Sequence, residues 1–209
     1  MIKAVIFDYD GVLVDSRDTG KAAFEAIAQY LGAPGFASLQ EFQRSQVKYE
    51  DLFARWGAIG EKKTHTQKIY RSVTAQNDIK LVPGIKNLLE KLSKKYTLAI
   101  VSGTYRELIE PVLSKHDMMK YFSVIVTKDD VQRAKPHPEG MHLCLKKLNL
   151  KESEAIFVGD MTMDIEMGRS SGVKTAIVSS FSWNTLEDLK QFKPDVLLEK
   201  PQDILQELP

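Results

Sequence analysis

Aspartates in two short segments are the residues of this 209-residue chain with the clearest capacity for chemistry. Asp8 and Asp10 follow an apolar run near the start of the chain, and Asp160 and Asp164 follow a later run. Two like charges about 4 Å apart repel by about 4 kcal/mol at an effective dielectric constant near 20, so four carboxylates that meet require protonation or a cation. Oxygen ligands favour a hard ion, and Mg²⁺ is commonly held by one or two carboxylates with waters and a substrate phosphate.

A hydroxyl and an ammonium group occur in comparable places. Ser102 and Gly103 follow the apolar run 98–101, and Lys135 opens a Lys-Pro-His-Pro segment just before a helical pattern. Phosphoryl transfer depends mostly on positioning and on neutralising the phosphoryl oxygens. Carboxylates that hold Mg²⁺, together with Lys135 and Ser102, could surround a phosphoryl group, provided that the fold brings them together.

The elements that must position these residues are short apolar strands alternating with amphipathic helices. The runs are rich in Val and Ile and apolar at consecutive positions, as in parallel strands covered on both faces. They span residues 2–7, 98–101, 124–126, 155–158, 175–178 and 196–198. The apolar stripes between them predict helices and a doubly wound, Rossmann-like α/β fold with a parallel sheet. In such sheets ligands bind beyond the carboxyl ends of the strands, where the residues above would meet.

One region interrupts the alternation. From about residue 16 to residue 80 the patterns are helical, without a convincing strand. We therefore expect a small helical domain, 16–80, inserted into a core domain made of 1–15 and 81–209.

Composition narrows the possible partners. Lys and Arg total 29 against 28 Asp and Glu, so the formal net charge of +1 argues against nucleic acid and membrane surfaces as partners. Cys144 is the only cysteine, which excludes an internal disulfide and a multi-cysteine zinc site. The apolar runs are too short to span a bilayer, and the first one reads as a strand rather than a signal peptide. We expect a cytoplasmic monomer or small homo-oligomer.

Each motif taken alone has a simpler interpretation. The Asp10-Gly11 pair between apolar residues is a common hairpin turn, and Gly159-Asp160 is common where a strand leads into a helix. Ser102 alone suits a helix cap, and Lys135 alone a solvated charge. The order of all four motifs, each after a suitable strand or before a suitable helix, favours a shared site.

The same four motifs resemble those of the haloacid dehalogenase superfamily of hydrolases. They are Asp-Tyr-Asp-Gly-Val-Leu-Val-Asp-Ser at 8–16, Ser102, Lys-Pro-His-Pro at 135–138 and Gly-Asp-Met-Thr-Met-Asp at 159–164. With the strand–helix pattern, the resemblance extends over essentially the whole chain. The helical insertion is similar to the cap of the phosphoglycolate phosphatase and β-phosphoglucomutase branch.

The resemblance implies a role for each residue. Asp8 would be the nucleophile that forms an aspartyl-phosphate, and Asp10 would protonate the leaving alcohol and later deprotonate water. Mg²⁺ would be held by the Asp8 side chain, the Asp10 carbonyl and Asp160, with Asp164 ligating or orienting. Ser102 and Gly103 would bind the phosphoryl group, and Lys135 would pair with Asp8 and the phosphate.

Departures from the family pattern favour a phosphatase that hydrolyses a small phosphate monoester, such as a phosphoglycolate-like compound or a sugar phosphate. Asp10 is kept, as ester hydrolysis requires, whereas dehalogenases lack this second acid. Gly20 stands where β-phosphoglucomutases typically carry His, which weakens a phosphosugar mutase. A pyrophosphatase or nucleotidase stays open, as does a non-enzymatic fold that binds phosphate or a partner. Lys48 and Arg55 in the insertion, and Arg106 after Ser102, are further candidates for substrate contact.

Overall fold

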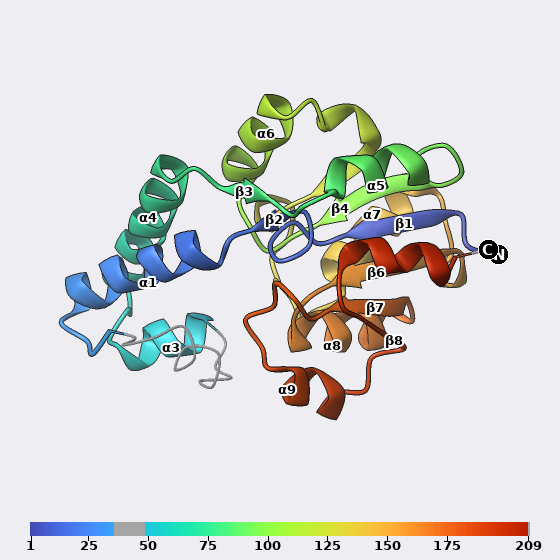
Figure 1. Ribbon diagram of the computed structural model, residues 1–209. Helices are drawn as coiled ribbons and strands as arrows, with labels where there is room; N and C mark the ends of the chain where they lie inside the picture. The colour runs from blue at the N-terminus through green and yellow to red at the C-terminus, as the bar shows by residue number, and fades with distance from the viewer. Residues whose placement is uncertain (36–48, 209) are drawn as a thin grey trace. The chain divides into compact units, whose positions relative to one another are not determined.

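The computed structural model describes residues 1–35 and 49–208 (Figure 1). The chain forms two compact units, one of residues 1–15 and 80–209 and one of residues 16–79. Lys80 falls in the first unit because the strand β3 (Lys80–Leu81) pairs antiparallel with β2 (Val14–Asp15). This pair joins the two chain segments that precede and follow the second unit in the sequence.

The first unit is built on a six-stranded sheet in the order β5-β4-β1-β6-β7-β8, with every pairing parallel. The strands are β1 (Ala4–Phe7), β4 (Thr97–Val101), β5 (Phe122–Val126), β6 (Ala155–Gly159), β7 (Lys174–Val178) and β8 (Val196–Leu198). All six apolar runs are strands of this sheet, which confirms the predicted parallel α/β core. The chain adds β4 and β5 on one side of β1 and then β6, β7 and β8 on the other, so the order reverses at β1.

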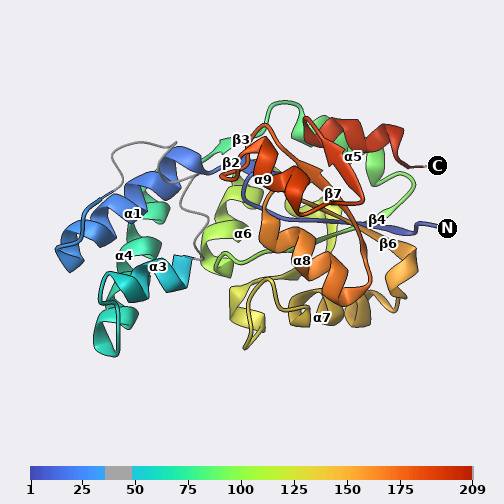
Figure 2. The same ribbon diagram turned by 90° about the horizontal axis from the view of Figure 1, so that it is seen from below.

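Helices cover both faces of the sheet. They are α5 (Ile85–Leu92), α6 (Arg106–Lys115), α7 (Glu139–Leu148), α8 (Thr162–Ser171) and α9 (Leu186–Gln191), with short 3₁₀ turns η1 (Met119–Tyr121), η2 (Lys128–Asp130), η3 (Glu152–Glu154) and η4 (Pro201–Gln206). Figure 2 shows α7 and α8 on one face and α5 with η4 on the other. This two-sided cover is the physical reason that the strands are apolar at consecutive positions.

The central strand β1 is buried along its whole length. Ala4 and Ile6 pack in one apolar cluster with Met141, Cys144 and Met167, on the face covered by α7 and α8. The alternate residues of a strand point to the opposite face. Because β1 pairs with β4 on one side and β6 on the other, the segment around Asp10-Gly11 does not form the simple hairpin that its sequence allows.

The second unit is helical in the residues that the structure describes. It contains α1 (Arg17–Leu31), α3 (Tyr49–Arg55) and α4 (Glu61–Gln76), and α1 packs against α4. Phe24 of α1 lies between helices, with ring centroids 5.3 Å from Phe53 and 6.3 Å from Tyr70. Aromatic contacts of this kind give the small unit its own apolar core.

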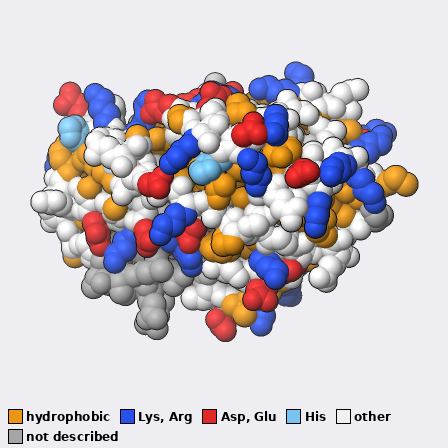
Figure 3. Space-filling view, turned by 45° about the horizontal axis from the view of Figure 1, so that its top comes forward, with side chains coloured by type: hydrophobic (Ala, Val, Ile, Leu, Met, Phe, Trp, Pro, Cys, Tyr) orange, Lys and Arg blue, Asp and Glu red, His pale blue; other side chains and the backbone are white. Residues whose placement is uncertain are grey.

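The described surface agrees with the balanced composition. On the face drawn in Figure 3, Lys and Arg side chains are interspersed with Asp and Glu side chains. Among the residues that the structure describes, no helix combines the length and the apolar character needed to cross a bilayer.

Candidate active site

Asp8 stands at the carboxyl end of β1, the point at which the strand order reverses. Its backbone N–H donates to the carbonyl of Val158 at 2.7 Å, which continues the pairing of β1 with β6. Its Oδ1 accepts a 2.7 Å hydrogen bond from the backbone N–H of Tyr9. The side chain is thus fixed by its own strand and turn, and Asp8 is only 7% exposed.

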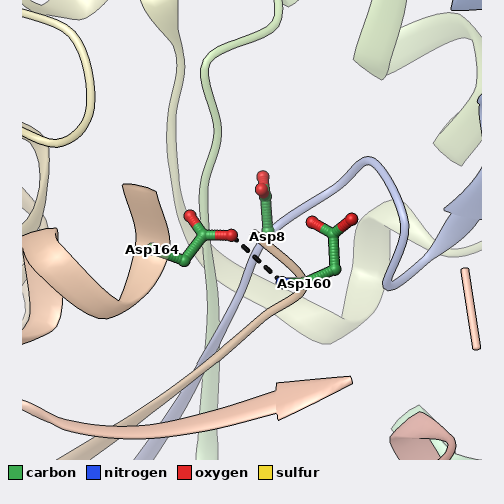
Figure 4. A group of neighbouring side chains, drawn as sticks. All are labelled: Asp8, Asp160 and Asp164. Carbon is green, nitrogen blue, oxygen red and sulfur yellow. Dashed lines mark hydrogen bonds between the residues drawn. The ribbon is translucent and has the colours of Figure 1, made fainter. Parts of the chain in front are cut away.

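Asp160 lies between β6 and α8, and Asp164 lies in the first turn of α8, where both meet Asp8 (Figure 4). Oδ2 of Asp164 accepts 3.0 Å hydrogen bonds from the backbone N–H groups of Asp160 and Met161. Backbone N–H groups at the start of a helix lack partners within the helix, so an acidic side chain that accepts from them is stabilising. Asp164 therefore shapes the turn that presents Asp160.

Lys135 connects the two segments. Its ammonium nitrogen lies 2.8 Å from Oδ2 of Asp8 and 2.9 Å from Oδ1 of Asp164. The same nitrogen is 5.0 Å from the centroid of the Phe157 ring. Asp164 thus contacts both the ammonium group of Lys135 and the backbone N–H groups that shape the Asp160 turn.

Burial and mutual repulsion control the protonation of these groups. Burial, with the nearby charges of Asp164 and Asp10, raises the pKa of Asp8 to about 7 despite the attraction of Lys135. Burial and the charges of Asp164 and Asp8 also raise the pKa of Asp160 well above its usual value. Burial alone would lower the pKa of Lys135, but the two carboxylates outweigh it and the pKa is raised. In both aspartates the protonated form is favoured, because burial and the neighbouring carboxylates disfavour charge more than Lys135 can offset.

The residues fit a divalent cation. Asp8, Asp160 and Asp164 are buried, and each offers a carboxylate oxygen within 4.8 Å of the others. These are hard oxygen donors of the kind that Mg²⁺ takes. Gly11 makes room for them: at φ +68° its backbone suits glycine, and a Cβ there would stand 2.2 Å from Oδ2 of Asp160. A side chain at position 11 would therefore occupy the space of the Asp160 carboxylate.

Asp10 and Ser102 are brought together by a residue that the sequence analysis did not single out. The Thr104 hydroxyl donates to Oδ2 of Asp10 at 2.6 Å, and the Thr104 backbone N–H donates to Oγ of Ser102 at 3.1 Å. Thr104 lies two residues beyond Ser102, past the end of β4. Its polar side chain at the carboxyl edge of the sheet was the signal that could have identified it.

Ser182 and Asn184 are two further residues that sequence reasoning missed. The Ser182 hydroxyl donates to the backbone carbonyl of Asp160 at 2.5 Å, and Oδ1 of Asn184 accepts from the backbone N–H of Thr162 at 3.0 Å. Both follow β7, the strand beside β6, and both are buried. Their hydrogen bonds fix the backbone of the segment that carries Asp160.

The other predicted residues have different surroundings. Ser102, Gly103 and Lys135 line one small pocket in the first unit. Arg106 is held by Glu110 at 2.9 Å and Asp130 at 2.7 Å, so its guanidinium is already paired. Arg55 is exposed at the end of α3 in the second unit. Lys48 lies outside the described residues.

At the carboxyl edge of its parallel sheet the protein gathers buried aspartates around one lysine. The model of the haloacid dehalogenase-like hydrolase family matches residues 5–178. The chain belongs to this family, which confirms the resemblance carried by its four motifs.

Individual relatives resemble the chain over nearly its whole length. Pyrophosphatase PpaX of Bacillus velezensis is 31% identical over 217 residues, which cover 98% of this chain and 95% of that protein. A solved structure from Lactobacillus plantarum, proposed to be a phosphoglycolate phosphatase, superposes with a TM-score of 0.87 at 25% identity over all of both chains. A Thermotoga maritima protein, proposed to be a β-phosphoglucomutase, gives 0.73 at 27% identity over all of both chains.

Proposed function

We propose that the protein is a Mg²⁺-dependent phosphatase that hydrolyses a small phosphate monoester through an aspartyl-phosphate. The observation that carries this proposal is the position of Asp8, which is buried, paired with Lys135 at 2.8 Å and gathered with Asp160 and Asp164. A nucleophilic carboxylate needs this environment, because a group that pairs with cations can attack an anionic phosphoryl group without prohibitive repulsion.

The residues of the chain would act in two steps. Asp8 attacks phosphorus while Asp10 gives a proton to the leaving alcohol oxygen, so that the ester P–O bond breaks as the aspartyl P–O bond forms. Asp10 then takes a proton from the water that attacks the aspartyl-phosphate, which returns Asp8 as a carboxylate. Lys135 and Ser102 would contact the phosphoryl oxygens, and Asp8, Asp160 and the Asp10 carbonyl would hold Mg²⁺. The bound ion would neutralise phosphoryl charge and reduce repulsion between the carboxylates.

The direct test measures phosphate release from a generic aryl phosphate and from a panel of metabolite phosphates, including phosphoglycolate and sugar phosphates. We expect Mg²⁺-dependent turnover by the wild type, loss of turnover on chelation, and no turnover by Asp8→Asn. The proposal fails if Asp8→Asn hydrolyses the aryl phosphate at the wild-type rate, or if chelation changes nothing. A hexose 1-phosphate in the panel distinguishes hydrolysis from isomerisation to the 6-phosphate.

Inorganic pyrophosphate is a second candidate substrate, because several relatives over 30% identical across nearly the whole chain are named pyrophosphatases. The chemistry at Asp8 would be the same, with phosphate in place of an alcohol as leaving group. Phosphate is a much weaker base than an alkoxide, so its departure depends less on protonation by Asp10. A kcat/KM for pyrophosphate well above that for every monoester in the panel would favour this function over ours.

A further inference from the structure

Thr104 makes a direct contact with the side chain proposed to move protons. Its hydroxyl donates to Oδ2 of Asp10 at 2.6 Å, across 94 positions of sequence. Thr104 is 6% exposed, so water competes little for this hydrogen bond. Hydrogen bonds from hydroxyl groups to carboxylates are short and strong, and they fix the orientation of the acceptor.

Both backbone groups of Thr104, the N–H and the C=O, are also hydrogen-bonded. Its backbone N–H donates to Oγ of Ser102 at 3.1 Å, and its carbonyl accepts from the backbone N–H of Lys128 at 3.1 Å. The first contact places the Ser102 oxygen as an acceptor, so the Ser102 hydroxyl proton points elsewhere and can be donated. One residue thus connects the proposed phosphoryl-binding hydroxyl to the proposed acid and base.

We propose that Thr104 is a positioning residue that holds the Asp10 carboxyl group in line for proton transfer. The hydrogen bond to Oδ2 fixes the orientation of the carboxyl group. From this orientation its proton moves to the leaving alcohol oxygen while the ester P–O bond breaks, and a proton from the attacking water replaces it in the second step. The inference rests on the proposed function, in which Asp10 is the acid and base.

Two kinds of substrate separate positioning of Asp10 from a general structural role. An alkyl phosphate has a basic leaving group that needs a proton, whereas a dinitrophenyl phosphate releases a weak base that does not. General acid catalysis contributes about 10²–10⁴-fold to rates. We expect Thr104→Val to lower kcat/KM for the alkyl phosphate by about tenfold or more, and to lower kcat/KM for the dinitrophenyl phosphate much less. Thr104→Ser keeps the hydroxyl and should restore most of the alkyl phosphate rate.

The matched control is Thr175→Val. Thr175 is also buried and also donates its hydroxyl to an aspartate, Asp195, at 3.0 Å, but it lies at the start of β7, away from the carboxyl edge. It should leave the ratio of the two kcat/KM values at the wild-type level. Thermal unfolding of each variant shows that it folds before its rates are compared.

A double-variant comparison tests whether Thr104 acts through Asp10. We expect Thr104→Val to have little effect on kcat/KM when added to Asp10→Asn, because the group that it positions has lost its acid function. The positioning role is overturned if Thr104→Val lowers both substrates equally, if Thr104→Ser fails to restore the rate, or if the two substitutions multiply. These outcomes require a wild type that is active and dependent on Asp8. A wild type without monoesterase activity would instead refute the proposed function.

Discussion

The ammonium nitrogen of Lys135 lies 2.8 Å from Oδ2 of Asp8, with the two side chains only 7% and 10% exposed. Buried charges are costly to separate, because removal of one partner leaves the other unpaired in a poorly solvated site. Lys135 also pairs with Asp164, so its loss would leave two carboxylates facing each other. The integrity of the site therefore depends on this one side chain.

Lys135→Met should abolish phosphatase activity and lower the free energy of unfolding by about 3–5 kcal/mol at pH 8. The loss should be smaller at pH 5, because Asp8 is then protonated. Urea unfolding at the two pH values measures both effects. Lys3→Met is the control, since Lys3 pairs with Glu154 on the surface with 60% of its side chain exposed. It should cost less than about 1 kcal/mol, and equal losses in the two variants would contradict the role of burial.

Two substitutions separate the two contacts of Asp164, its backbone hydrogen bonds and its ion pair with Lys135. Asp164→Asn keeps an oxygen that accepts from the backbone N–H groups of Asp160 and Met161, but it removes the charge that pairs with Lys135. Asp164→Ala removes both, so it should be less stable than Asp164→Asn by about 1–3 kcal/mol. Mg²⁺ affinity, measured by calorimetry, should fall by about 10–100-fold even in the Asn variant. Equal stability of the two variants would show that the backbone hydrogen bonds contribute nothing.

The stability of the metal-free protein should fall as the pH rises from 5 to 7.5. The pKa of Asp8 is about 7 in the folded protein against 3.8 as its ordinary value, so between these pH values the folded state binds a proton that the unfolded state has released. Folding is then favoured at the lower pH, by on the order of a few kcal/mol. Thermal unfolding in a chelating buffer, compared with Asp8→Asn, isolates this contribution. A variant with the same pH slope as the wild type would refute it.

Mg²⁺ binding should show the complementary trend. A protonated carboxyl group is a poor ligand, so binding at pH 6 must release a proton that is already absent at pH 8. We expect the apparent affinity for Mg²⁺ to increase as the pH rises through about 7, where Asp8 loses its proton. Calorimetry in buffers of different ionisation enthalpy measures the proton released, and a pH-independent affinity would contradict the raised pKa of Asp8.

Ser182 should matter for both stability and metal binding. Ser182→Ala leaves the buried carbonyl of Asp160 without its hydroxyl donor, which should cost about 1–3 kcal/mol and weaken Mg²⁺ binding. Ser93→Ala is a suitable control, because Ser93 also donates to a backbone carbonyl, at 3.1 Å, but on an exposed helix end. If both substitutions have the same small effect, the Asp160 turn does not depend on Ser182.

The sheet could be predicted because its strands are defined by local sequence. Runs such as 155–158 are apolar at consecutive positions, and only a strand covered on both faces explains that pattern over so short a length. Asp8 and Asp160 could then be expected to meet, since adjacent parallel strands end at the same edge. The register of β1 against β6, which pairs Phe7 with Val158, places them side by side.

The hydrogen-bonded neighbours of the site could not be predicted in the same way. Thr104 and Ser182 are ordinary polar residues in loops, and nothing in their own sequence indicates which distant group they contact. Their partners, Asp10 and Asp160, are decided by the packing of loops at the edge of the sheet. Arg106 shows the same difficulty from the other side. Its sequence position suggested a substrate contact, but its guanidinium group pairs with Glu110 and Asp130.

The central place of β1 has a consequence for how the protein is made. The ribosome releases Asp8 before the neighbouring strands β4 and β6, which begin at residues 97 and 155. Parallel neighbours so distant along the chain carry a large loop-closure cost and fold slowly. During synthesis the apolar segment Ala4–Phe7 therefore stays unpaired until β4 and β6 have been made. A chain shortened before residue 155 would lack β6, one of the two neighbours of β1. Such intermediates are expected to depend on chaperones.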